Sequence, residues 1–133
     1  MAKKKKRKRR APVNPSMLNC HHILWQARHW DNGYAKALRN HEYMKKMIPR
    51  DTLHKEIHSE ISDIPMPSGK LCEKAYREIE RLYREELIDF DYDSIETRID
   101  VLLQIWAEDD CEPTKAMLRK ERAIAHNFYS QGK

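Results

Sequence analysis

Histidines are concentrated in one part of this chain, and their spacing suits metal binding. Six of the seven histidines lie between residues 21 and 58, at positions 21, 22, 29, 41, 54 and 58. In the segment RDTLHKEIHSEI, the apolar residues Leu53, Ile57 and Ile61 recur every four residues and predict a helix. Side chains four residues apart lie on one helical face, so His54 and His58 can bind one ion together. Taken alone, the pair is also typical of two solvated surface histidines.

A second pair, His21 and His22, lies near the end of a predicted strand. Successive strand residues point to opposite faces, so adjacent histidines can serve one site only where the strand ends or bulges. There, one of the two can complete a three-histidine site while the other stands beside the metal without binding it. Three protein ligands and one open position are typical of catalytic zinc, whereas structural zinc usually has four protein ligands.

Two strands and a long connection must position these side chains. Residues 17–24 (MLNCHHIL) and 42–49 (EYMKKMIP) predict strands, and Pro49 ends the second. The 17 residues between them contain a turn signal at 31–33, and residues 34–39 can form a helical turn. A connection of this length is typical of a functional loop.

The C-terminal half is predicted to be helical. Apolar residues at helical spacing indicate helices at about 70–88, 94–108 and 114–129, after a break rich in proline and glycine at 64–69. The expected fold class is therefore α+β, mainly α, with a small ββα unit followed by three C-terminal helices.

The segment DFDYDSIETRID (89–100) places acidic residues where a calcium-binding loop has them. A serine stands at the position that needs glycine, and Glu96 stands where an apolar residue is usual. Asp93 as a helix cap, with Glu96 three residues later, explains the same pattern, so we interpret the segment as a helix start. The same reasoning predicts Asp51 and Thr114 as caps of two other helices.

The order of these features resembles the HNH, or ββα-metal, nuclease family: a strand with two adjacent histidines, a long loop, a second strand ending in proline, and a helix with H-x-x-x-H. The resemblance covers about residues 18–60, rests on HHIL and IPRDTLHKEIH, and is closest to the nuclease domains of DNA-degrading colicins. It implies that His22 is the general base. The metal ligands that it implies are His21, His54 and His58.

The family also has a middle asparagine, which fixes the loop so that the base is oriented. Asn40 is the best equivalent in this sequence and Asn32 is the next, but neither has the family's spacing from His54. The connection between the two histidine pairs is also longer than in colicins. By resemblance, Asn40 joins His22 as a catalytic residue.

Charge divides the chain into parts. The run KKKKRKRR at 3–10 carries eight positive charges, and residues 11–133 contain 18 basic and 21 acidic side chains. Adjacent like charges repel, so we expect residues 1–16 to be a disordered basic tail and linker that contacts nucleic acid. A solubilising arm or a nuclear import signal would have the same composition. Residues 17–64 then form the HNH-like motif, and residues 65–133 form the helical part of the same domain.

The expected function is hydrolysis of phosphodiester bonds in DNA, with RNA as another substrate that the sequence allows. A neutral imidazole with an ordinary pKa near 6.5 suits His22 to accept a proton from water. The expected cofactor is one divalent ion, either Zn or one of Mg, Mn and Ni. The residues expected to contact phosphates are Lys3, Lys4, Lys5, Lys6, Arg7, Lys8, Arg9, Arg10, Arg28, Arg39, Lys45, Lys46 and Arg50.

Two other classes of function fit the same residues. In the first, the protein binds nucleic acid without cleaving it, and its histidines hold a structural zinc. In the second, the acidic helices at 70–129 bind a partner protein and the histidine region is a remnant of the fold. The amphipathic C-terminal helices can also form a homodimer.

Composition excludes several classes. The longest apolar run, VLLQIWA at 101–107, is far shorter than the roughly 20 residues of a membrane-spanning helix. No apolar segment follows the basic run, so it does not resemble a secretion signal. The three widely spaced cysteines indicate neither a disulfide framework nor a cysteine zinc site. We expect an intracellular protein, cytoplasmic if bacterial or phage-encoded and nuclear if eukaryotic, without a membrane partner.

Overall fold

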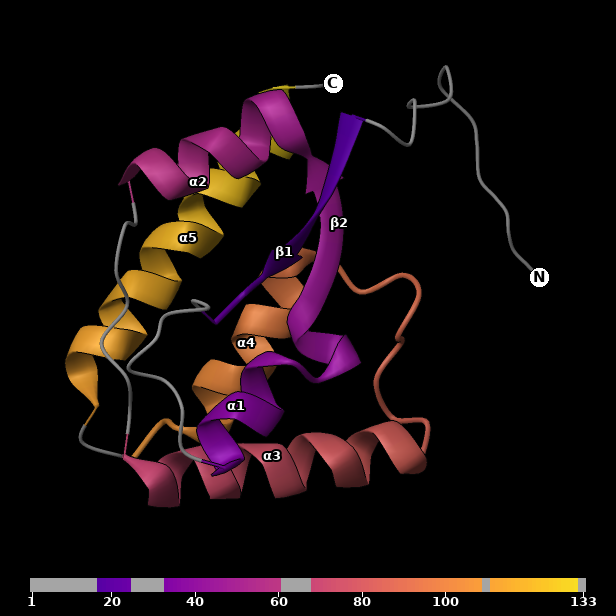
Figure 1. The fold of residues 1–133 in the computed structure, drawn as a ribbon, viewed down its shortest axis with the longest axis vertical. Helices are drawn as coiled ribbons and strands as arrows, with labels where there is room; N and C mark the ends of the chain where they lie inside the picture. Colours follow the sequence, from indigo (N-terminus) through magenta and orange to yellow (C-terminus); the bar gives the residue numbers. More distant parts are fainter. Residues whose placement is uncertain (1–16, 25–32, 61–67, 109–110, 132–133) are drawn as a thin grey trace.

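The computed structural model describes residues 17–24, 33–60, 68–108 and 111–131. Strands β1 (Leu18–His22) and β2 (Lys45–Pro49) form a two-stranded antiparallel sheet, with Leu18 opposite Pro49 and His22 opposite Lys45 (Figure 1). The described residues also form five α-helices, and the last three of these follow the helical segment at 50–60 that bears His54 and His58. The fold class is therefore α+β and mainly α, as predicted.

The second strand is shorter than predicted. Residues Glu42–Met44 form a 3-10 turn, and pairing begins only at Lys45. The His41 imidazole accepts a hydrogen bond from the backbone N–H of Tyr43 at 3.0 Å. This local bond competes with the extended conformation, so the chain turns before it enters the sheet.

The two faces of the sheet differ in burial. Asn19 pairs with Ile48, and the side chain of His21, two residues after Asn19, lies on the same face. Ile48 is fully buried and His21 is 2% exposed, whereas Cys20 and Met47 on the other face are exposed. The inward face therefore carries His21 into the interior of the protein.

A short helix occupies part of the connection between the strands. α1 (Gly33–Arg39) confirms the helical turn predicted at 34–39, buries Ala35 and Leu38, and packs against α3 (Gly69–Arg84) (Figure 1). Residues 25–32, which include Arg28 and Asn32, lie outside the described residues.

The helical segment at 50–60, which bears His54 and His58, begins differently from the predicted start at Asp51. Residues Arg50–His54 form a π-helical turn that continues into α2 (Lys55–Glu60). Asp51 lies inside this turn, and the residue before the turn is Pro49, which makes no side-chain capping bond. The prediction of Asp51 as N-cap is therefore wrong, because the N-cap position is that of Pro49, two residues earlier. Leu53 and Ile57 are both buried, as the apolar spacing predicted.

The C-terminal part consists of α3 (Gly69–Arg84), α4 (Ile95–Ile105) and α5 (Glu112–Gln131). Two of their predicted caps are wrong. Ser94, not Asp93, caps α4 by accepting the N–H of Thr97, and Asp93 instead accepts the Tyr43 hydroxyl at 2.6 Å. α5 begins before Thr114, which is fully buried and accepts a hydrogen bond from the Cys111 thiol.

The strands and helices share one hydrophobic core. Arg98 on α4 is only 2% exposed and links the helix to the sheet. Its guanidinium donates to the backbone oxygens of Tyr43 at 3.1 Å, Asp93 at 2.9 Å and Phe90. The main buried apolar residues are Ile23, Leu24, Leu38, Tyr43, Met44, Ile48, Leu53, Ile57, Ile79, Ile99, Leu102, Trp106 and Leu118.

None of the helices in the described part of the chain has the length and apolar character needed to cross a membrane.

Candidate metal centre

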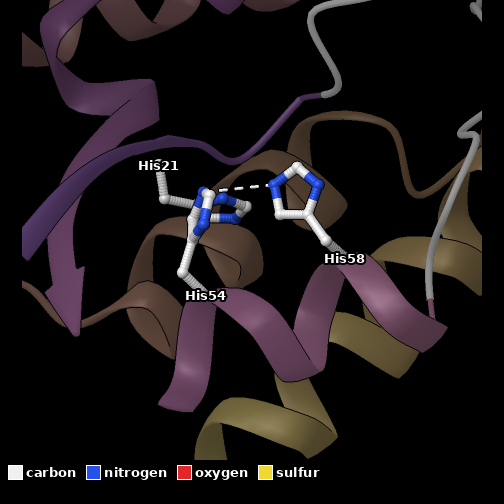
Figure 2. Close-up of side chains that lie close together, drawn as sticks. All are labelled: His21, His54 and His58. Atoms are coloured by element: carbon white, nitrogen blue, oxygen red, sulfur yellow. Dashed lines mark hydrogen bonds between the residues drawn. The ribbon is translucent and has the colours of Figure 1, made fainter. Parts of the chain in front are cut away.

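Three histidines, one buried and two partly exposed, converge at one place in the fold. His21 projects from β1, while His54 and His58 project from the helical segment after β2, and the three rings face one another (Figure 2). One ring nitrogen from each residue lies within 4.8 Å of those of the other two. The ring centroids of His21 and His54 are 5.4 Å apart, and those of His21 and His58 are 6.1 Å apart. The structure therefore brings together the three residues expected to hold a metal.

The two helix histidines are the closest pair. Their Nε2 atoms are 3.1 Å apart and their ring centroids are 4.2 Å apart. Two nitrogens bound to one tetrahedral zinc at about 2.0 to 2.1 Å are separated by about 3.4 Å. His54 and His58 are thus already spaced as two ligands of one ion.

Both helix histidines favour the neutral form that binds metal. Burial, followed by the neighbouring imidazoles of His58 and His21, lowers the pKa of His54 to about 4. Burial and then His21 also lower the pKa of His58. Because a protonated imidazole has no lone pair to donate, these shifts keep both ligands available at neutral pH.

His21 is held from behind by a carboxylate. Its Nε2 lies 2.8 Å from Oε2 of Glu121, and the side chains are 2% and 1% exposed. The other ring nitrogen, Nδ1, is buried and has no hydrogen-bond partner. Buried polar atoms are rarely left without a partner, so an unpaired imidazole nitrogen beside two other histidines fits a metal ligand. A histidine that donates its second N–H to a carboxylate is a common arrangement at metal sites.

Glu121 belongs to α5, and no motif in the sequence identified it as part of the site. Burial raises its pKa, while the hydrogen bond with His21 acts in the opposite direction. One signal was present in the sequence: Glu121 lies on the same helical face as Leu118 and Ala125, three residues before and four after it. Both neighbours are fully buried. A carboxylate on the apolar face of a helix requires a partner in the core.

His22 and Asn40, the predicted catalytic pair, contact each other outside the group of three converging histidines. His22 is the last residue of β1, so its side chain points away from the face that carries His21. Burial lowers its pKa, followed in effect by Lys45, His21 and Arg39, whereas a side-chain hydrogen bond with Asn40 raises it. Among the described residues, the converging ligand group contains His21, His54 and His58 but not His22.

The predicted phosphate contacts separate into two groups. Lys45 and Arg39 lie close enough to His22 to influence its pKa. Lys46 donates to the backbone oxygen of Asp91 at 3.4 Å, and Arg50 is exposed and pairs with Asp51. Thus Lys45 and Arg39 bring positive charge to His22, whereas Lys46 lies beside the acidic turn at residues 89–93. The tail lysines and arginines at 3–10, together with Arg28, lie outside the described residues.

Two other histidines form ordinary structural pairs. His41 caps the 3-10 turn and its Nε2 lies 2.6 Å from Glu80. His126 on α5 is exposed, and its Nδ1 lies 2.8 Å from Glu96. Neither belongs to the converging group.

Comparison with protein-family models, with curated proteins and with solved structures finds no match to this chain. Its function must therefore be inferred from the side chains and their geometry.

Proposed function

We propose that this protein is a metal-dependent, HNH-like endonuclease that hydrolyses phosphodiester bonds in DNA. The convergence of His21, His54 and His58 supports the proposal most directly. Three imidazole ligands suit a divalent transition metal such as zinc or nickel better than magnesium, which prefers oxygen ligands. The set also leaves the open coordination position that catalytic sites use.

The metal would polarise a phosphate oxygen and stabilise the charge that develops on the leaving oxygen. His22 is the proposed general base, because its lowered pKa keeps the imidazole neutral and able to accept a proton from water at pH 7. Asn40 is proposed to hold the His22 ring, through the hydrogen bond that the two side chains form. Lys45 and Arg39 supply positive charge beside His22, where a phosphate would approach.

The basic residues at 3–10 are proposed to hold DNA through its phosphates, without reading sequence. RNA offers the same phosphates, so substrate competition must decide between the two. With a DNA substrate the protein would act inside the cell, in the cytoplasm of a bacterium or the nucleus of a eukaryote.

The test is nicking of supercoiled plasmid DNA by the full-length protein with Mg²⁺, Mn²⁺, Ni²⁺ or Zn²⁺, from pH 6 to 9. We expect cleavage by the wild type with at least one ion, and a loss of about 10² to 10⁴ in turnover for His22→Ala. His126→Ala is the matched control, because it removes a histidine that lies outside the metal group. Absence of cleavage with every ion, or full activity of His22→Ala, would contradict the proposal.

One observation favours a second candidate, a structural metal in a nucleic-acid-binding protein. The histidines and Glu121 link β1, the segment after β2, and α5, which are far apart in sequence. A metal at this point would hold these elements together whether or not catalysis occurs. If this candidate is correct, zinc removal unfolds the protein, and the zinc-loaded protein binds DNA but does not cleave it.

A further inference from the structure

We propose that α5 completes the metal centre, because Glu121 fixes the ring of His21 so that His21 binds the ion through Nδ1. The two helix histidines, His54 and His58, would then bind through Nε2. The inference rests on the metal site of the proposed function, but it does not depend on DNA cleavage.

The two nitrogens of His21 have different surroundings. Burial raises the pKa of Glu121, but whenever its carboxylate is ionised it only accepts hydrogen bonds, and the 2.8 Å contact then places the proton on Nε2 of His21. In a neutral imidazole the other nitrogen, Nδ1, then carries a lone pair. That atom is buried and has no hydrogen-bond partner. A buried lone pair without a partner is the feature that a metal ion would satisfy.

Glu121 itself lies behind the ring and outside the ligand group. Among the described residues, the nitrogens that converge come from the three histidines, and no carboxylate oxygen joins them. Glu121 therefore acts on the ion through His21, as a positioning residue. Its own position is fixed because Leu118 and Ala125, on the same face of α5, are fully buried.

The helix histidines present the opposite nitrogen. The Nε2 atoms of His54 and His58 face each other at 3.1 Å, and Nδ1 of His54 lies 3.5 Å from the side-chain nitrogen of Asn19 on β1. If Nε2 binds the metal, Nδ1 of His54 carries the proton. Asn19 can accept a hydrogen bond from that N–H once its amide is turned to present the oxygen. The site would therefore combine one Nδ1 ligand, from His21, with two Nε2 ligands, from His54 and His58. Glu121 would hold the ring of His21, and Asn19 would hold the ring of His54.

The direct test is the protonation pattern of the rings in the zinc-loaded, ¹⁵N-labelled full-length protein. Two-bond ¹H–¹⁵N correlation spectra distinguish a protonated ring nitrogen from one that binds metal. We expect the proton on Nε2 of His21 and on Nδ1 of both His54 and His58. A zinc-loaded protein in which His21 carries its proton on Nδ1 would overturn the proposal.

Substitution of Glu121 gives a second, independent test, with zinc affinity measured by competition against a chelator. Glu121→Ala should weaken zinc binding about 10- to 100-fold, the usual effect of losing a group that orients a ligand. Glu121→Gln retains an oxygen that accepts from Nε2, so it should recover most of that affinity. The matched control is Glu96→Gln on α4, which alters another histidine–glutamate pair, the one that Glu96 forms with His126 on α5. It should leave zinc affinity unchanged.

The outcomes separate this inference from the nuclease proposal. Zinc binding with the expected ring pattern but no DNA cleavage would refute the nuclease and support the role of Glu121. Cleavage together with wild-type zinc affinity in Glu121→Ala would refute the role of Glu121 alone. If Glu121→Ala does not fold, judged by circular dichroism, the ring pattern of the wild type and the affinity of Glu121→Gln decide. If the wild type binds none of Zn²⁺, Ni²⁺, Mn²⁺ and Mg²⁺, both proposals are refuted.

Discussion

The imidazoles of His54 and His58 stand one helical turn apart with their Nε2 atoms 3.1 Å from each other. At this separation the rings cannot both be protonated without strong repulsion, and burial adds to the cost of charging either one. The pair therefore favours two neutral imidazoles that bind one metal ion over two protonated rings.

The first prediction concerns the stability of the metal-free protein as a function of pH. The pKa of His54 is about 4 in the folded chain and near 6.5 in an unfolded one. The unfolded state therefore binds more protons between these values. The stabilisation from neutral His54 is fully present above about pH 6.5 and is lost as pH falls towards 4. Urea unfolding with EDTA, at several pH values, should show a shallower fall for His54→Gln than for wild type. Identical slopes would contradict the lowered pKa.

The second prediction concerns metal content. The full-length protein should bind about one zinc per chain, and the double variant His54→Ala, His58→Ala should bind none, because two of three ligands are gone. Metal analysis after dialysis measures both. His126→Ala serves as the control and should bind as wild type does. Equal uptake by wild type and the double variant would exclude the site.

The third prediction concerns the bond between Asn40 and His22, which raises the pKa of the imidazole. Asn40→Ala removes that bond, so the pKa of His22 should fall further. The acid limb of the profile of kcat/KM against pH should then move to lower pH, and kcat should drop because the ring is no longer oriented. Plasmid nicking across the acidic to neutral pH range would measure both effects. An acid limb that stays in place would mean that Asn40 does not act on the base.

The fourth prediction concerns Arg98, which holds the sheet to the acidic turn through several backbone oxygens. Arg98→Ala leaves these buried and partly buried oxygens without their donor and should destabilise the fold by about 3 kcal/mol. Arg81→Ala is the control, because Arg81 is exposed and its ion pairs with Glu78 and Glu85 lie at the surface, where such pairs contribute little to stability. Chemical unfolding compares the two. A destabilisation by Arg98→Ala no larger than that of the control would show that water replaces its bonds.

The fifth prediction concerns the basic residues 3–10. Deletion of residues 1–10 should preserve the helical circular dichroism signal but weaken DNA binding. The slope of log affinity against log salt should decrease by up to about 0.9 for each phosphate that the tail no longer neutralises. The control replaces residues 3–10 with uncharged residues at the same length, and should behave like the deletion. An unchanged slope would show that the tail serves another ligand.

Local patterns in the sequence predicted the features that depend on local geometry. The spacing of His54 and His58 placed them on one helical face, and β-type segments on either side of a long loop gave the two strands. Caps were harder to predict, since Asp93 and Ser94 are adjacent and both residue types cap helices well. The structure selects Ser94 because the Asp93 carboxylate is engaged by the hydroxyl of Tyr43, 50 residues away.

Glu121 illustrates why part of the site could not be predicted. Its partner His21 lies 100 residues earlier, so no spacing rule relates the two. The sequence contains only an indirect signal, a carboxylate on an apolar helical face, and such a residue has many candidate partners. Only the position of α5 beside β1 and the helical segment at 50–60 identifies His21 as the partner of Glu121.

The distance in sequence between His21 and Glu121 also bears on how the protein is made. A growing chain contains all three candidate ligands once residue 58 has been synthesised, yet it lacks the carboxylate that would orient the first of them until residue 121 follows. Nascent chains, and fragments ending before α5, would therefore bind zinc weakly. If the centre cleaves DNA, this order of synthesis would delay the activity until residue 121 has been added to the chain.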